Sequence, residues 1–152
     1  FSIGGAAFPE GHLESGDRVS EMNYFKKKAD AGMKFGITQL FFFFMFYFEF
    51  VESCSKNGIE IPIIPGLMPI TGYGQIERFT AMCGTEIPKK LIEKIEKFKD
   101  NKEDIEKVGI EYATNQCIQL LESGTRGIHF YTLNKSTATM EIYKNIKNYI
   151  QK

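Results

Sequence analysis

Short apolar runs alternate with amphipathic helical patterns along this chain, and the alternation restricts the folds that the chain can adopt. A strand followed by a helix that packs back on the sheet is the repeating unit of parallel α/β folds. Glycine, proline and asparagine separate the segments, as expected where strands and helices end. The pattern predicts strands at 1–8, 34–42, 59–64 and 127–133, and helices at 20–32, 46–56, 74–82, 88–98, 101–122 and 136–150.

The sequence also predicts how two of these helices begin or pack. Ser20 is expected to cap the helix that follows it, with Glu21 in the first turn, where a negative charge suits the helix dipole. In the last helix, apolar residues at helical spacing predict one buried face. That face comprises Met140, Tyr143, Ile146 and Ile150.

Four strand–helix units, the last delayed by an extra pair of helices, fit a small doubly wound sheet or half of a (β/α)8 barrel. A complete barrel takes about 250 residues, so a chain of 152 residues would carry only its later strands. The apolar residues at the start of the chain favour the partial barrel, which we expect to form a single domain over residues 1–152. In both architectures, ligands bind at the carboxyl ends of the strands.

The charge balance and the cysteines exclude several classes of partner. Nineteen basic side chains balance nineteen acidic ones, which gives no electrostatic reason to expect nucleic acid or an anionic membrane. The longest apolar run, from Leu40 to Val51, is too short to cross a bilayer. Cys54, Cys83 and Cys117 lie far apart and form no CxxC pair, so we expect neither a metal site nor a disulfide framework. A reducing, cytoplasmic setting is therefore expected.

Polar residues follow several of the expected strands, but each one alone has an ordinary structural explanation. His12 is typical of a surface or structural histidine, and backbone groups could satisfy a buried Gln39 amide. The lysines at 26–28 are typical of a solvated helix face, and Asn134-Lys135 of a turn. From the residues alone, the interpretation reaches a binding site of unknown contents at one end of a parallel sheet.

Five segments, in this order and spacing, resemble one enzyme family. They are GAAFPEGH at 5–12, KKADAG at 27–32, ITQLFF at 37–42, IIPGLMPI at 63–70 and HFYTLN at 129–134. Together they extend along almost the whole chain, and five ordered segments are far more specific than any single motif. The chain resembles the carboxyl-terminal part of the catalytic barrel of the 5,10-methylenetetrahydrofolate reductases.

The resemblance implies a (β/α)8 barrel that binds FAD without a covalent bond. In this family, NADH or NADPH reduces the flavin, and 5,10-methylenetetrahydrofolate then accepts hydride to give 5-methyltetrahydrofolate, a step of one-carbon metabolism that supplies methionine. The cofactor supplies the redox chemistry, while the protein positions and polarises the reactants. The resemblance further implies a homo-oligomer or a complex with the other half of the barrel, without which these residues are expected to be inactive.

Matching positions imply which residues meet the ligands. Lysines near a diphosphate make charge-assisted hydrogen bonds, and an amide can serve two ligands in turn because it both donates and accepts. The positions expected to contact FAD are Ala6, Phe8, His12, Glu21, Tyr24, Lys27 and Lys28. Those expected to contact the folate are Gln75, Phe79, Lys135 and Gln39, the last of which would also touch the nicotinamide. The family's catalytic acid belongs to earlier strands, so no residue of this chain is expected to be catalytic.

One segment departs from the family pattern. Polar or acidic residues usually follow the strand that carries the glutamine, whereas Phe43, Phe44 and Met45 stand there in this chain. Three explanations are open: genuine divergence, an apolar contact with the missing half of the barrel or another subunit, or an error in the sequence at that point. A different class of function is also open, a non-catalytic flavin- or folate-binding βα domain or an assembly of half-barrels.

Overall fold

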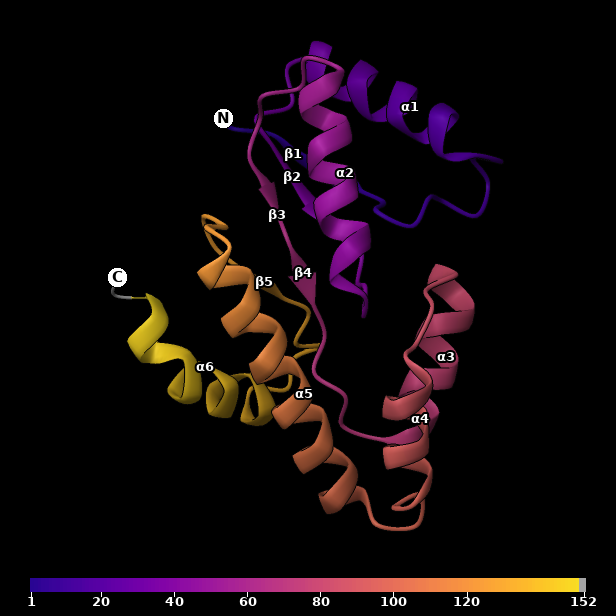
Figure 1. Cartoon of the computed structure of the whole chain (residues 1–152), viewed down its shortest axis with the longest axis vertical. Helices are drawn as coiled ribbons and strands as arrows, with labels where there is room; N and C mark the ends of the chain where they lie inside the picture. The colour runs from indigo at the N-terminus through magenta and orange to yellow at the C-terminus, as the bar shows by residue number, and fades with distance from the viewer. Residues whose placement is uncertain (151–152) are drawn as a thin grey trace.

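The computed structural model of this protein describes residues 1–150 and shows a mixed α/β fold (Figure 1). Every strand pair in this part of the chain is parallel, which confirms the expected α/β class. The elements, in chain order, are β1 (Gly4–Ala7), α1 (Arg18–Asp30), β2 (Phe35–Thr38), α2 (Phe44–Lys56), β3 (Ile63–Ile64), β4 (Gly66–Leu67), α3 (Tyr73–Cys83), α4 (Lys89–Glu96), α5 (Lys102–Glu122), β5 (His129–Phe130) and α6 (Thr137–Ile150).

The strands form two small parallel sheets. β1, β2 and β3 pair in that order, with Ala7 opposite Thr38, and β4 pairs with β5. Pro65 stands between β3 and β4, and because proline has no N–H to donate, it interrupts the ladder there. The strands are shorter than the sequence predicts. The apolar run at 34–42, for example, is a strand only as far as Thr38, and its remaining residues enter the core as a loop.

Thr38 joins the two sheets. The N–H of Gly66, at the start of β4, donates to the Thr38 hydroxyl at 2.8 Å, and the Tyr131 hydroxyl, just after β5, donates to the Thr38 carbonyl at 2.8 Å. A Cβ at Gly66 would collide with that carbonyl, so this close approach requires glycine. The end of β2 is therefore fixed against both β4 and β5.

The first helix begins earlier than the sequence predicts. Asp17, rather than Ser20, is the N-cap, because its carboxylate accepts both the Ser20 N–H and the Ser20 hydroxyl at 2.8 Å. The bond from the backbone N–H is the main reason that the pKa of Asp17 is lowered. Ser20 thus lies inside the first turn, together with Glu21.

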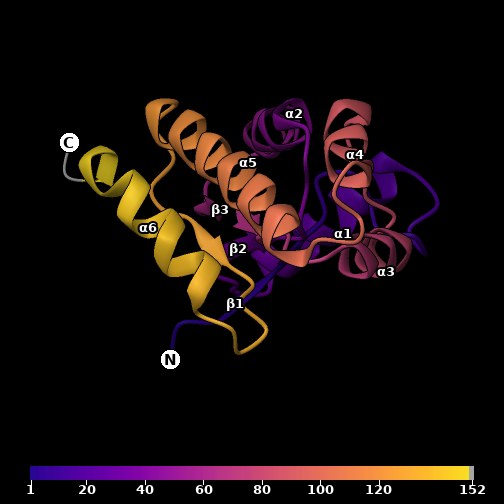
Figure 2. The same cartoon turned by 90° about the horizontal axis from the view of Figure 1, so that it is seen from below.

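The last helix buries a different face from the predicted one. Figures 1 and 2 show α6 lying along α5, and the packing against α5 selects residues four positions apart. The buried residues are Ala138, Ile142 and Ile146. Of the predicted face only Ile146 is buried, whereas Met140, Tyr143 and Ile150 are 51%, 47% and 49% exposed. Apolar residues occur on several sides of this helix, so its partner helix decides which side is covered.

Three apolar clusters make up the core. One lies beneath α3, α4 and α5, a second joins β4 to α5 and α6, and a third packs α1 and α2 against β1. Leu40 and Phe42 belong to the first cluster, whereas Phe41 between them belongs to the second. The extended segment after β2 therefore holds two clusters together.

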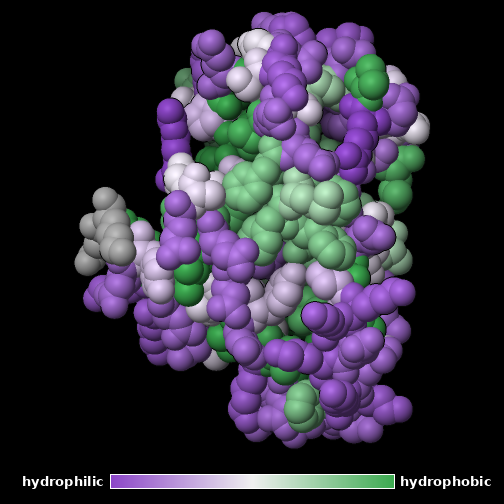
Figure 3. Space-filling view, in the orientation of Figure 1, coloured by the Kyte–Doolittle hydropathy of each residue, from purple (hydrophilic) through white to green (hydrophobic). Residues whose placement is uncertain are grey.

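The phenylalanine-rich segment covers this loop and the first half of α2. Phe41, Tyr47 and Phe50 are buried, whereas Met45 and Phe48 are 55% and 40% exposed. The segment is thus partly core and partly surface, and Figure 3 shows an apolar area in the middle of one face of the molecule. Within residues 1–150, no helix is long and apolar enough to span a membrane.

Candidate functional site

The ends of β1 and β2 bring residues from both expected ligand sets to one cavity. Because Ala7 and Thr38 are opposite each other in parallel strands, the residues that follow them emerge at the same edge. The Gln39 N–H donates to the Ala7 carbonyl at 2.7 Å and continues this alignment. The cavity has a volume of about 240 Å³ and is lined by Phe8, His12, Leu13, Glu14, Gln39, Met82 and Cys83.

Only one end of the Gln39 side-chain amide forms a hydrogen bond. Its Oε1 accepts the Leu40 N–H at 3.0 Å, which fixes the amide plane. Its NH2 group donates to no protein group within the described residues. Gln39 therefore offers a hydrogen-bond donor in the cavity, and an acceptor such as a carbonyl oxygen is the complementary ligand group.

His12 and Phe8 form an aromatic pair beside Gln39. Their ring centres are 4.7 Å apart and their planes meet at 82°, an edge-to-face contact. The Nδ1 atom of His12 accepts the Glu14 N–H at 3.1 Å. A neutral imidazole that accepts at Nδ1 carries its proton on Nε2, so this ring also presents a donor.

Among the α1 residues expected at the cofactor, Lys28 reaches the end of β1. Its Nζ donates to the Ala6 carbonyl at 2.9 Å and lies 5.5 Å from the centre of the Phe8 ring. Tyr24 and Lys27 are exposed and contact each other, with the ammonium 5.5 Å from the ring centre. The structure thus brings Ala6, Phe8 and Lys28 together, and leaves Tyr24 and Lys27 on the open side of the helix.

Glu21 occupies a separate position between α1 and α2. The residue is only 4% exposed, and its Oε2 accepts the Ser15 hydroxyl at 2.6 Å. The other oxygen, Oε1, is buried and has no hydrogen-bond partner in the part of the chain that the structure describes. Glu21 and Phe8 both line a cavity of about 350 Å³. A hydroxyl or amine of a ligand there would satisfy the unpaired oxygen.

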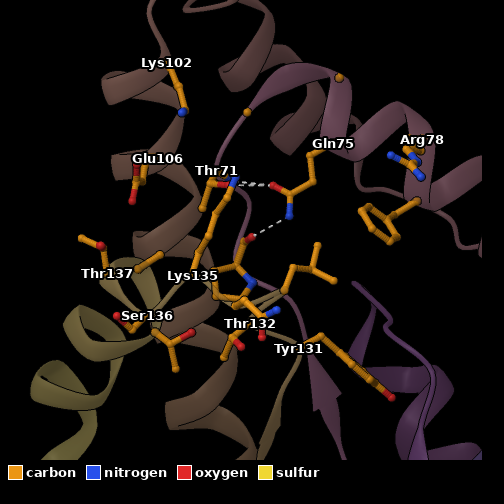
Figure 4. Close-up of a pocket in the computed structure, with 18 residues that line it drawn as sticks. Thr71, Gln75, Arg78, Lys102, Glu106, Tyr131, Thr132, Lys135, Ser136 and Thr137 are labelled. Atoms are coloured by element: carbon orange, nitrogen blue, oxygen red, sulfur yellow. Dashed lines mark hydrogen bonds between the residues drawn. The ribbon is translucent and has the colours of Figure 1, made fainter.

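A larger cavity, of about 760 Å³, collects the remaining expected folate residues, Gln75, Phe79 and Lys135. It lies between the start of α3, the start of α5 and the loop from β5 to α6 (Figure 4). The Gln75 Oε1 accepts the Thr71 N–H at 2.8 Å and the Thr71 hydroxyl at 2.9 Å, and its Nε2 donates to the Pro69 carbonyl at 3.4 Å. Both ends of the Gln75 amide are therefore engaged in holding the loop after β4.

The larger cavity is positively charged. Arg78, Lys102 and Lys135 line it together with one carboxylate, that of Glu106. None of these four side chains forms an ion pair with any residue between 1 and 150. The arrangement favours an anionic ligand with an apolar part, since Phe79 supplies a ring in the same wall.

Several lining residues were not predicted from the sequence. Tyr131, whose pKa is raised by burial, lines the larger cavity, and its place near the carboxyl end of the strand expected at 127–133 was the available signal. Cys83, whose pKa is also raised by burial, lines the cavity of about 240 Å³ beside Gln39. Nothing in the sequence indicated that Lys102 and Glu106 line a cavity, because only the packing of α5 places them there. No group of three or more His, Cys, Asp or Glu side chains that could hold a metal ion occurs over residues 1–150.

The sequence is closely related to known proteins. The profile of the family described as "Methylenetetrahydrofolate reductase" matches residues 1–147. A "Probable methylenetetrahydrofolate reductase (NADPH)" of Caenorhabditis elegans is 40% identical over 147 residues, which cover 96% of this chain and 22% of that protein. A "5,10-methylenetetrahydrofolate reductase" of Buchnera aphidicola subsp. Schizaphis graminum is 40% identical over 142 residues, or 93% of this chain and 49% of that protein. The chain therefore spans about half the length of the bacterial relative and less of the nematode one.

A solved structure supports the fold. An uncharacterized protein from Clostridium thermocellum that binds two copies of 5-methyl-5,6,7,8-tetrahydrofolic acid aligns with a TM-score of 0.62 over 100% of this chain and 55% of that chain. At 21% identity, this likeness concerns the fold alone. The family profile, in contrast, covers nearly the whole sequence. This chain belongs to the methylenetetrahydrofolate reductase family.

Proposed function

We propose that this chain is part of an FAD-dependent reductase that uses NADH or NADPH to convert 5,10-methylenetetrahydrofolate into 5-methyltetrahydrofolate. The observation that best supports the proposal is the gathering of Phe8, His12 and Gln39 in one cavity at the ends of two parallel strands. The names of the relatives suggest the reaction, and this edge of the sheet offers a place for it. In this proposal, residues 1–152 form the later strands of a (β/α)8 barrel, and the earlier strands complete the site.

Two features of the chain fit a flavin dinucleotide. The buried Oε1 of Glu21 lacks a partner, and a ribose hydroxyl of the cofactor would supply one. Lys28 already holds the Ala6 carbonyl beside the Phe8 ring, which places a cation where the cofactor would pass. When bound, FAD carries hydride from the nicotinamide to the folate. The residues proposed to hold FAD are Ala6, Phe8, His12, Glu21, Tyr24, Lys27 and Lys28.

Gln39 is proposed to orient both reactants in turn. Because its Oε1 is occupied by the Leu40 N–H, the free NH2 group is the part that a ligand would meet. The carboxamide of a nicotinamide and the pterin ring of a folate both carry carbonyl oxygens that accept such a bond. One donor at a fixed place thus suits two ligands that use the same face at different times.

The larger cavity is proposed to hold the rest of the folate. Phe79 would pack on an aromatic ring of the substrate, and Lys135 would pair with a carboxylate of its glutamate part. Gln75 would mainly hold the loop after β4 in place and form part of the cavity wall, because its amide is already hydrogen-bonded to Thr71 and Pro69. Tyr131 connects this cavity to Thr38, the residue before Gln39.

The proposal is tested by the Gln39→Ala substitution in the protein that carries this chain, followed in the two half-reactions separately. The rate at which methylenetetrahydrofolate reoxidises the reduced flavin should fall about tenfold or more, as expected when one hydrogen bond to the reacting molecule is lost. Rapid mixing with detection of flavin absorbance measures this rate.

The exposed Gln119 on α5 provides the matched control, because Gln119→Ala removes the same side chain at a position that lines none of the three cavities. An unchanged folate half-reaction in Gln39→Ala would remove Gln39 from the site. A protein that carries flavin and binds folate without turnover would instead indicate a binding module, and a protein that binds neither would contradict the proposed function.

A further inference from the structure

The three residues after Gln39 are held by side chains, because β2 has already ended there. The backbone carbonyls of residues 40–42 each accept a hydrogen bond from a side chain that comes from later in the sequence. The donors and acceptors are Thr85 to Leu40 at 3.1 Å, Gln116 to Phe41 at 3.2 Å and Tyr112 to Phe42 at 2.7 Å. Buried carbonyls require such partners where a strand ladder stops, so these bonds fix the path of the segment.

Thr85 holds the carbonyl of this segment that is nearest in sequence to Gln39. The Leu40 N–H is bonded to the Gln39 Oε1 at 3.0 Å, and the Leu40 carbonyl is bonded to the Thr85 hydroxyl. Only the φ and ψ angles of Leu40 separate these two groups, since peptide planes are rigid. Thr85 is 7% exposed and lines none of the three cavities described above. Its hydroxyl therefore affects the Gln39 amide through Leu40, without touching a ligand in those cavities.

The segment between α3 and α4, residues 84–88, also holds another wall of the cavity beside Gln39. The Glu86 N–H donates to the Oε2 of Glu10, and Leu13 contacts the start of the segment. Glu10 and Leu13 belong to the loop after β1, which carries His12 into the cavity. One short segment, which contains Thr85, therefore fixes the distance between two walls of this cavity.

We propose that Thr85 is a positioning residue that holds the Gln39 amide where it meets the reactants. This inference rests on the proposed function, in which the NH2 group of Gln39 orients the nicotinamide and the folate in turn. Without the Thr85 hydroxyl, the buried Leu40 carbonyl would lose this partner, and its backbone would turn toward another donor. The Gln39 amide, bonded to the N–H of the same residue, would move with it. Small displacements of a group that orients a reactant slow the reaction.

The experiment uses Thr85→Val, which removes the hydroxyl and keeps the side-chain shape, in the protein that carries this chain. The rate at which saturating methylenetetrahydrofolate reoxidises the reduced flavin should fall about three- to tenfold, the equivalent of one net hydrogen bond. The flavin content should not change. Thr85→Ser, which keeps the hydroxyl, should retain most of the natural rate. Rapid mixing with detection of flavin absorbance measures these rates.

A double-substitution cycle tests whether Thr85 acts through Gln39. In a protein that already carries Gln39→Ala, Thr85→Val should change the rate less than about 1.5-fold, because the amide that it positions is absent. The same fold loss in both backgrounds would mean that Thr85 acts by another route, and it would overturn the inference. An unchanged rate in Thr85→Val alone would overturn it too.

Tyr112→Phe is the matched control, because it also removes a hydroxyl that donates to a carbonyl of the segment 40–42, two residues farther from Gln39. Tyr112 lines none of the three cavities. Its substitution should change the rate less than about twofold. A loss as large as that in Thr85→Val would indicate general loosening of the segment and would overturn the specific role of Thr85.

A second variant covers the case in which Thr85→Val does not fold, as judged by its circular dichroism. Thr85→Cys keeps a group of similar size, and because a thiol is a weak donor, its rate should fall by at least about twofold. A natural rate in Thr85→Cys would then overturn the inference. Failure of the unsubstituted protein to reoxidise its flavin with methylenetetrahydrofolate would contradict the proposed function itself, a result separate from the effects of Thr85.

Discussion

At the scale of single residues, the junction of the two sheets depends on one glycine. Gly66 approaches the Thr38 carbonyl so closely that a methyl group would occupy the same space, and its N–H also bonds the Thr38 hydroxyl. Thr38 is fully buried and precedes Gln39, so a displacement here would move the amide proposed to meet the substrates. Stability and site geometry are thus coupled at this position.

The Gly66→Ala substitution should lower the free energy of unfolding by about 1–3 kcal/mol, the usual cost of forcing an added methyl group into a packed interior. Urea denaturation followed by circular dichroism measures the change. Gly127→Ala is the control, because nothing lies within 4 Å of a Cβ built there and Gly127 has no positive φ. Equal stability of the two variants would show that the backbone at Gly66 can move aside without cost.

Some site residues follow from the sequence and others do not, for a physical reason. Phe8 and Gln39 each follow a strand, and parallel strands place their carboxyl ends at one edge of the sheet. The sequence pattern of the strands is therefore enough to predict that these two residues lie close together. Lys102 and Glu106 lie on a helix surface and reach the cavity only because α5 packs across it. A charge pattern on a helix does not reveal which end faces a ligand, so these two residues required the structure.

At the scale of elements, the sequence predicts the order of helices and strands better than their contacts. The helices begin and end near their predicted positions because capping groups such as Asn101 act locally, accepting the N–H groups of Glu103 and Asp104. The prediction that Met140 lies on the buried face of α6 was wrong, because the packing of α6 against α5 determines which face is buried. Local signals therefore specify the elements, and packing specifies their faces.

One carboxylate links two loops that flank the smaller cavity. Glu10 lies in the loop after β1, and Glu86 lies between α3 and α4. The Oε2 of Glu10 accepts the Glu86 N–H at 3.0 Å. The Oε1 of Glu10 is buried and has no hydrogen-bond partner in the described structure. Burial raises the pKa of Glu10, and the Glu86 N–H opposes this rise in part. The ionised form is therefore less favourable in the folded protein than in the unfolded one.

This shift predicts how stability depends on pH. A raised folded pKa means that the contribution of Glu10 is fully present below its ordinary value of 4.5 and is lost as the pH rises through the folded pKa. Glu10→Gln keeps an acceptor oxygen without the charge, so it should be at least as stable as the natural protein near neutral pH. Urea midpoints should converge as the pH falls toward about 4. The exposed Glu60→Gln is the control, and a stability difference independent of pH would contradict the assignment to Glu10.

At the scale of the whole molecule, the three clusters of the core share residues. Ile63 packs against both the second and the third cluster, and the segment 40–42 contributes alternately to the first and the second. Each cluster also contacts one free cysteine: Cys83 the first, Cys117 the second and Cys54 the third. The thiols thus report on separate parts of one core.

Because the clusters are joined through Ile63 and 40–42, we expect the core to open as a unit. Burial raises the pKa of Cys54 and of Cys117 to about 12, so neither thiol should react with a thiol reagent in the folded protein. Both should become reactive at the same urea concentration, as measured by pulsed alkylation and mass spectrometry of the peptides. Cys83, which is only partly buried, should react earlier and provides the internal reference. Reaction of Cys54 at a lower urea concentration than Cys117 would mean that α1 and α2 separate before α5 and α6, and that the shared residues do not couple the clusters.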